Sequence, residues 1–527
     1  MDRERVIEAS FVDLDPRPRV WRGTGCWWES ANWEPAGLPN TGSPVAIAAG
    51  TITVDTPFSV GGLVISNGAA LRTEGWDSVV TVGGDMDVFG MLTSVFSDAD
   101  PVTRAIAVTN RIVIVCTNLT VHAGGAVSAD TNGFRGALTH PTIAPQWGFG
   151  PGAGYQSTGG SYGGFGSIHG YGSGGYVGPT YGTAEDPGLP GSSGGGNNGY
   201  FGKPGGGLVR IAAGGTVTVN GAITADGGDY TGASSGGSGG GIYIRCLVFA
   251  ADNGRINADG GCTGPGQWDG GGGGGGRIAI HYDPAAQAAA NLVKMPVVRL
   301  SARSWWGRYK RGTPGTIWLT DGGFFPGNAT ALHGGEVLFG NPGDYSCTTA
   351  TLVCSNDFVS LPAGCAVAVD GDLTVSLDSG LLMRGPLTVG GSATFDANTQ
   401  GLPSQVYATN GSGVAIAGDL TVRGLPLAFY SGGADRMQVT VGGSCHITNG
   451  SNARITSGIA PGYPLQPGSE LIVGHDLMIA SNATLFLESH PTNGGSPHIS
   501  ARSVMVGAGG RIDADATGFG GGPGPTN

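Results

Sequence analysis

Two neighbouring stretches decide the fold: residues 205–228 read GGGLVRIAAGGTVTVNGAITADGG, and residues 238–261 read SGGGIYIRCLVFAADNGRINADGG. Equivalent positions lie 33 residues apart, as in the pairs Ile211 and Ile244, Ile223 and Ile256, Asp226 and Asp259. Several matches at one constant offset indicate a repeat architecture, in which each unit buries its apolar face only against its neighbours.

A shorter repeat fills both flanks of this region. Residues 367–375 read VAVDGDLTV and residues 414–422 read VAIAGDLTV. Apolar residues at every second position predict short strands with one buried face, and the glycine between paired strands lets the chain bend. We therefore predict an all-β chain, a right-handed parallel β-helix (a β-solenoid) with long Gly-rich insertions.

The composition excludes several other classes of protein. The chain has 104 glycines among 527 residues, yet charged residues make up only 12%. Collagen would need glycine at every third position, and a disordered acidic tail would need far fewer apolar residues. The net charge of -12 disfavours a nucleic-acid partner. Because no apolar run reaches the ~20 residues of a spanning helix, we expect no transmembrane segment.

Three stretches carry a resemblance to known proteins. Residues 21–47 read WRGTGCWWESANWEPAGLPNTGSPVAI, residues 271–280 read GGGGGGRIAI, and residues 312–319 read GTPGTIWL. Together with the GDLTV units, they resemble bacterial secreted or cell-surface parallel β-helix proteins, of the autotransporter-passenger and filamentous-adhesin kinds. The resemblance implies an extracellular or cell-surface protein with a structural or adhesive function. No signal peptide is visible in this chain.

The chain divides into five predicted parts. They are an N-terminal strand and Trp-rich cap (1–50), the first β-helix coils (51–145), a Gly/aromatic-rich insertion (146–206), the Gly-rich repeats with a basic, Trp-containing loop (207–334), and C-terminal coils ending in an open Gly-rich spacer (335–527). The insertion has two open interpretations. It is either a flexible adhesive loop or an ordered loop whose aromatic rings fold back over the coils.

The two ends of the chain suggest self-association. The C-terminal spacer lacks the strand that follows similar spacers, while an apolar segment containing Val6, Ile7, Phe11 and Val12 precedes the cap. One hypothesis is head-to-tail assembly into a surface filament, in which a neighbouring chain completes the last coil. The other is a boundary within a longer repeat protein. Neighbouring surface proteins are a second class of partner that we consider for this chain.

Aromatic and basic residues supply the remaining candidate interaction sites. In the insertion they are Trp147, Tyr155, Tyr162, Tyr171 and Tyr176, and in the basic loop they are Trp305, Trp306 and Arg308. The basic loop is either a solvated turn or a groove for glycans. The second interpretation supports an alternative function as a polysaccharide-active lyase or glycoside hydrolase, or as a carbohydrate-binding module.

The pattern of the acidic residues indicates a structural role and not a catalytic one. Asp130, Asp226, Asp259 and Asp515 recur at one repeat position, whereas an active site is a unique constellation, so we expect them to form turns. We predict no enzyme activity, catalytic residue, cofactor or metal site. One alternative remains open, in which the stacked Asp row binds Ca²⁺ through its oxygen atoms. The eight cysteines include no CxxC pair, which leaves buried thiols or local disulfides such as Cys347 with Cys354.

Overall fold

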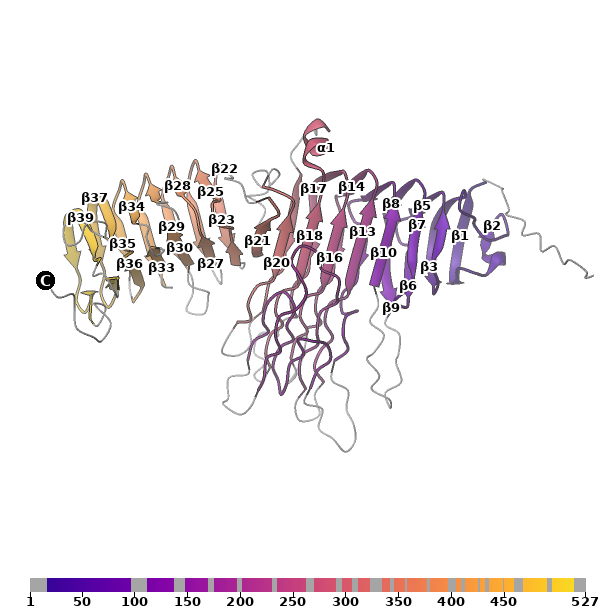
Figure 1. The fold of residues 1–527 in the computed structure, drawn as a ribbon, viewed down its shortest axis with the longest axis horizontal. Helices are drawn as coiled ribbons and strands as arrows, with labels where there is room; N and C mark the ends of the chain where they lie inside the picture. The colour runs from indigo at the N-terminus through magenta and orange to yellow at the C-terminus, as the bar shows by residue number, and fades with distance from the viewer. Residues whose placement is uncertain are drawn as a thin grey trace, which may run out of the picture.

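The structure is a computed structural model of the chain. It describes the residues from Arg17 to Asp515 apart from the internal segments 96–110, 137–146, 169–174, 197–200, 230–234, 262–269, 291–295, 306–310, 323–333, 342–345, 356–357, 377–379, 397–403, 409–412, 425–426, 432–435, 449, 459–467 and 491–494. The strands stack along one axis, from the N-terminal part in indigo to the C-terminal part in yellow (Figure 1).

Nearly all regular structure in the described residues is β-strand, arranged in three sheets. The N-terminal sheet holds β1 (Arg19–Cys26), β2 (Trp33–Glu34), β3 (Pro44–Val54), β5 (Gly62–Ile65), β6 (Ala70–Glu74), β8 (Asp85–Val88), β9 (Met91–Val95), β11 (Asn118–Val121), β12 (Ala126–Ser128), β14 (Thr216–Val219), β15 (Ala222–Thr224), β17 (Val248–Asn257) and β19 (Val297–Ser301).

The long sheet extends from residue 58 to residue 513. It holds β4 (Phe58–Val60), β7 (Val79–Val82), β10 (Arg111–Cys116), β13 (Leu208–Ala213), β16 (Gly241–Arg245), β18 (Arg277–His281), β20 (Thr316–Leu319), β21 (Gly335–Phe339), β24 (Phe358–Ser360), β27 (Gly380–Met383), β30 (Ser404–Ala408), β33 (Leu427–Ser431), β36 (Asn452–Thr456), β38 (Thr484–Glu488) and β40 (Arg511–Asp513).

The C-terminal sheet replaces the N-terminal one beyond β21. It holds β22 (Ser346–Thr349), β23 (Leu352–Ser355), β25 (Ala366–Val369), β26 (Leu373–Ser376), β28 (Leu387–Val389), β29 (Ala393–Asp396), β31 (Val414–Ile416), β32 (Leu420–Arg423), β34 (Met437–Val441), β35 (Cys445–Ile447), β37 (Ser469–Ile479) and β39 (Pro497–Val506). The prediction of an all-β chain is confirmed, and the described pairings are parallel except for β1 with β2 and isolated bridges in the insertion.

The sequence repeats correspond to strand pairing. Ile211 of β13 pairs with Ile244 of β16, and Ile223 of β15 pairs with Ile256 of β17. All four side chains are fully buried. Each repeat therefore adds a strand to the long sheet and then strands to the N-terminal sheet, and identical apolar side chains stack along the axis. Such stacking gives the continuous interior that one repeat cannot form alone.

A tryptophan cluster closes the N-terminal end. The ring of Trp33 lies 5.2 Å from that of Trp21 and 4.8 Å from that of Trp27, and all three side chains are buried. The short strand β2 pairs antiparallel with β1, next to the 3-10 turn η1 (Ser30–Asn32). Trp28 stays exposed and donates its indole N–H to Asp55 at 2.9 Å.

The described helix α1 (Pro284–Ala289) lies in an alanine-rich segment. Its Gln287 side chain accepts the backbone N–H of Phe249 at 2.8 Å and donates to the carbonyl of the same residue at 2.9 Å. A side-chain amide thus takes the place of a neighbouring strand at the start of β17. The backbone N–H and C=O groups of Phe249 at this strand edge would otherwise be open to pairing with another strand. No described helix is long and apolar enough to cross a membrane.

Gly-rich segments leave the coils and pack together below β10 to β20 in Figure 1. We call them the glycine bundle: the described residues 147–168, 175–196, 201–207, 226–229, 235–240, 258–261, 270–276, 302–305 and 311–315. Gly236 and Gly239 donate their N–H groups to the segment 271–274, while Gly237 and Gly240 donate to the segment 225–228. Partners that recur every third residue indicate extended helices with three residues per turn, the geometry of polyproline II.

Glycine is required at the packed positions of the glycine bundle, where one backbone lies directly against another. A Cβ atom on Gly237 would lie 1.9 Å from the carbonyl oxygen of Pro204, and one on Gly273 would lie 1.9 Å from that of Gly237. Hydrogen bonds between main chains therefore replace the side-chain core that other domains use. The described part of residues 146–206 is thus an ordered loop, which was the second of the two interpretations of this insertion.

Candidate functional site

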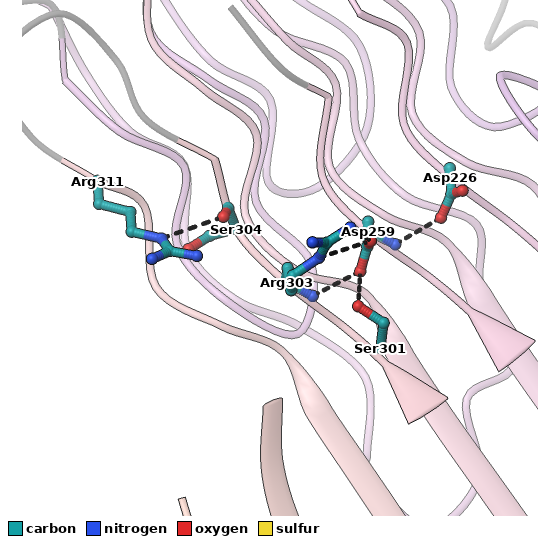
Figure 2. A network of polar contacts seen from close by, with 6 residues as sticks. All are labelled: Asp226, Asp259, Ser301, Arg303, Ser304 and Arg311. Carbon is teal, nitrogen blue, oxygen red and sulfur yellow. Dashed lines mark hydrogen bonds and ion pairs between the residues drawn. The ribbon is translucent and has the colours of Figure 1, made fainter. Parts of the chain in front are cut away.

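The recurrent aspartates form a ladder where the glycine bundle joins the coils. We call Asp130, Asp226 and Asp259 the aspartate ladder. The Oδ1 atom of Asp130 accepts the backbone N–H of Asp226 at 2.7 Å, and the Oδ1 atom of Asp226 accepts that of Asp259 at 2.7 Å. Each carboxylate therefore fixes the next coil at the residue where the chain turns into the bundle, as Figure 2 shows for Asp226 and Asp259.

Arg303 ends this ladder. Leu300 and Ser301 pair with Ile256 and Asn257, so Arg303 occupies the repeat position of an aspartate. Its backbone N–H donates to Oδ1 of Asp259 at 2.8 Å, while its Nε and Nη2 atoms donate to Oδ2 at 2.9 and 2.7 Å. The two side chains are 18% and 7% exposed. A largely buried ion pair thus balances the last carboxylate of the row (Figure 2).

The middle carboxyl group lacks such compensation. Burial, the neighbouring Asp259 and the neighbouring Asp130 raise the pKa of Asp226 well above its ordinary value. Hydroxyl groups support the two outer carboxylates, since Thr224 donates to Asp130 and Ser301 to Asp259.

At the corresponding position beside Asp226, the next coil carries Asn257. The Oδ1 atom of Asn257 is buried and finds no donor among the described residues. These surroundings favour a protonated Asp226, because a neutral carboxyl group avoids repulsion from both neighbouring carboxylates.

A second ladder in the C-terminal coils shows how this repulsion is avoided elsewhere. There, Asp372 accepts the N–H of Ser392 at 2.8 Å, Ser392 accepts that of Asp419 at 3.1 Å, and Asp419 accepts that of Ser444 at 2.7 Å. Serine thus separates successive carboxylates. Since both ladders hold coil to coil through backbone N–H groups, the aspartates serve as turn acceptors, as their recurrence predicts.

The ladder geometry does not form an ion-binding cage. Its carboxylate oxygens are directed to backbone N–H groups, hydroxyl groups and Arg303. Among the described residues, no group of three or more His, Cys, Asp or Glu side chains is placed to hold a metal ion. The stacked Asp row therefore gives no support to a Ca²⁺ site.

The basic loop is described only in part. Trp306 and Arg308 lie outside the described residues. Arg303 also lies over the ring of Trp305, 5.2 Å from its centroid, and Arg311 donates from Nε to the carbonyl of Ser304 at 3.2 Å. Arg303 and Arg311 thus make contacts inside the protein. The carboxylate of Asp259, which is bonded to this loop, is already paired with Arg303.

The aromatic candidates of the insertion separate into two groups. Tyr162 is fully buried, 4.6 Å from the ring of Tyr181 and beneath the guanidinium of Arg277. Its prediction as an interaction residue is wrong, because it fixes the insertion against the outer face of the long sheet. Trp147, Tyr155 and Tyr176 instead lie together near the surface. Tyr171 lies outside the described residues, as do Val6, Ile7, Phe11 and Val12.

The sequence patterns considered above did not identify Arg303 as the residue that ends the ladder. The motif apolar-x-Ala-Asp recurs in residues 256–259, and residues 300–303 read LSAR, with arginine in place of aspartate. A search for the same motif with the opposite charge would have found it. The position of Asp226 between two other carboxylates, by contrast, depends on which coils are adjacent in space.

Three of the described thiols are buried and hard to deprotonate. Burial raises the pKa of Cys116, Cys246 and Cys445 to about 12 in each case, and Cys26 is half-buried. The side chain of Cys347 is outside the described set, so its suggested bond to Cys354 stays a prediction.

These pKa values predict the order of thiol alkylation in the folded protein. Because the thiolate is the reacting species, we expect iodoacetamide at neutral pH to modify Cys26 well before Cys116, Cys246 or Cys445. Peptide mass spectrometry of samples quenched over time measures this order, and the same reagent in denaturant is the control. Equal rates at all four positions would contradict the burial described here.

Comparison with known proteins found no matching family model, no similar curated protein and no similar solved structure.

Proposed function

We propose that the three rows of parallel strands form a right-handed parallel β-helix. Three observations support it: the strands of the long sheet follow one another from β4 to β40 in chain order, the repeats pair in register, and the apolar side chains point inward. The right hand follows from the general preference of strand–crossover–parallel strand connections.

We further propose that this β-helix is an extracellular structural or adhesive protein. The observation that carries the proposal is the glycine bundle, a lateral projection held by main-chain hydrogen bonds. Glycine loses more conformational freedom on folding than any other residue, so ordering so many of them opposes stability. A projection that is ordered at this cost and carries exposed aromatic rings fits a surface that presents a contact site. The resemblance of the repeats to secreted β-helix proteins favours the same function.

Self-association belongs to this proposal. The side chains of Val504, Met505 and Val506 on β39 are each about half exposed, and β37 is the one strand paired with β39 among the described residues. At the other end, β2 already pairs with β1. A head-to-tail contact would therefore use the segment that contains Val6 and Phe11, which would add a strand to β39 of the next copy.

Electron microscopy and cell labelling test the proposed function. We expect purified protein to appear as rods with one lateral projection, and as longer filaments at high concentration. Deleting residues 1–16 should abolish filaments and leave single rods. Antibodies against the glycine bundle should label intact producing cells without permeabilisation. Labelling only after permeabilisation would contradict the extracellular proposal, and single rods at every concentration would contradict self-association.

A further inference from the structure

Three aromatic rings of the glycine bundle form an exposed group, which we call the aromatic cluster: Trp147, Tyr155 and Tyr176. The ring centroid of Trp147 lies 4.6 Å from that of Tyr155 and 5.9 Å from that of Tyr176, with interplanar angles of 37° and 55°. Trp147 is 54% exposed and Tyr176 is 53% exposed. Because the rings are tilted against one another, they do not cover each other's faces as parallel stacked rings would.

The main chain under the aromatic cluster is fixed. The N–H of Tyr155 donates to the carbonyl of Tyr176 at 2.9 Å, and the hydroxyl of Thr158 lies 2.9 and 2.7 Å from the carbonyl oxygens of Tyr155 and Tyr176. The N–H of Gly148 donates to the carbonyl of Gly154 at 2.9 Å, which closes the loop between the first two rings. The backbone that carries the rings is therefore ordered before a ligand arrives, which lowers the entropy lost on binding.

The surroundings of the aromatic cluster define the chemistry of its partner. Residues 147–184 include no Asp, Glu, Lys or Arg, and Ile168 and Val177 are their only residues of the Val, Leu, Ile and Met types. An ionic ligand would find no counter-charge on this segment. A protein partner would find few of the aliphatic side chains that fill a typical interface core. What the segment offers is aromatic faces, hydroxyl groups and glycine main chain.

We propose that the aromatic cluster binds a neutral polysaccharide by stacking against its sugar rings. A pyranose ring has an apolar C–H face and a rim of hydroxyl groups, so it matches a surface with apolar ring faces and polar groups around them. Trp147 contacts both tyrosines, so it is the central stacking residue. This inference rests on the adhesive function proposed above and names the class of molecule to which the protein adheres.

Affinity electrophoresis of the purified full chain tests this proposal. Native gels would contain one of four neutral polysaccharides (hydroxyethylcellulose, laminarin, galactomannan or soluble starch) or the anionic alginate. We expect at least one neutral polysaccharide to retard the wild type and alginate not to. Trp147→Ala should weaken the interaction at least tenfold, Tyr176→Ala should weaken it less, and Tyr176→Phe, which retains the ring, should preserve it.

The matched control is Trp28→Ala, which removes an exposed tryptophan from the N-terminal cap, where Trp28 is 40% exposed. This variant should migrate like the wild type. Circular dichroism should be unchanged in every variant, which separates lost binding from lost folding. The proposal is overturned if no neutral polysaccharide retards the wild type, or if Trp147→Ala binds as well as the wild type.

Sedimentation velocity separates glycan binding from self-association. If the wild type self-associates and Trp147→Ala stays monomeric, the aromatic cluster is a contact between copies of the chain and the glycan proposal fails. Purified protein is used throughout, so the result does not depend on cell-surface labelling. A chain that binds glycan but does not label intact cells would contradict only the proposed location.

Discussion

Replacing Gly237 with alanine is expected to unfold the glycine bundle while the coils remain folded. The new methyl group would lie 1.9 Å from the carbonyl oxygen of Pro204, and main-chain atoms cannot rotate away as a side chain can. Overpacking in cores typically costs 1–3 kcal/mol, so a clash with backbone should cost at least about 3 kcal/mol. Hydrogen-exchange mass spectrometry should show lost protection in the bundle segments and retained protection in β13 and β16.

The matched control is Gly188→Ala, elsewhere in the glycine bundle. There the nearest atom to the new Cβ is Nη1 of Arg210 at 3.8 Å, an ordinary contact. This variant should stay within about 0.5 kcal/mol of the wild type. If the two variants show the same exchange and the same melting temperature, close main-chain packing is not what holds the bundle.

Asp259→Asn is expected to cause the second large loss of stability. The substitution keeps the size of the side chain but leaves the guanidinium of Arg303, 18% exposed, without its carboxylate. Removing one partner of a buried ion pair costs 3–5 kcal/mol, and we expect about 3 kcal/mol here because the pair is partly accessible. Thermal and denaturant unfolding at neutral pH measure this loss.

Asp226→Asn in the same ladder should have the opposite sign. The pKa of Asp226 is raised in the folded state by burial and by Asp259 and Asp130. Its contribution to stability is therefore complete at acid pH, below the unfolded pKa, and is lost as the pH rises through the folded pKa. The asparagine variant lacks this loss, so it should exceed the wild type by at least about 1 kcal/mol at neutral pH.

The difference between Asp226→Asn and the wild type should shrink toward zero as the pH falls below the ordinary range of an aspartate pKa. Melting temperatures of both proteins across the acid-to-neutral range give this difference directly, and subtraction removes the titration of carboxylates that do not interact with Asp226. A variant that is less stable than the wild type at neutral pH would show that Asp226 is stabilised as an anion.

The coils could be predicted from the sequence because their information is local. Alternating apolar residues specify strands, and the offset that aligns Ile211 with Ile244 is the spacing at which those residues pair. The Trp-rich segment 21–33 indicated a cap for a similar reason, since its side chains contact one another within a single short segment.

The glycine bundle could not be predicted in the same way. Its segments have almost no side-chain pattern, and their hydrogen bonds join residues far apart in the sequence, as when Gly274 donates to Gly160. Composition therefore indicated only a Gly-rich insertion. The burial of Tyr162 and the exposure of Trp147 were also beyond reach, because both depend on how these segments fold back over the long sheet.

The period of three in the glycine bundle restricts how its segments can change length. Along residues 236–240, successive N–H groups point to different neighbours, and the same neighbour returns after three residues. Removing one or two residues would rotate the rest of the segment by a third or two thirds of a turn and direct every later N–H to the wrong partner. We therefore expect packed segments to tolerate insertions and deletions best in multiples of three amino acids, and β-strands in multiples of two.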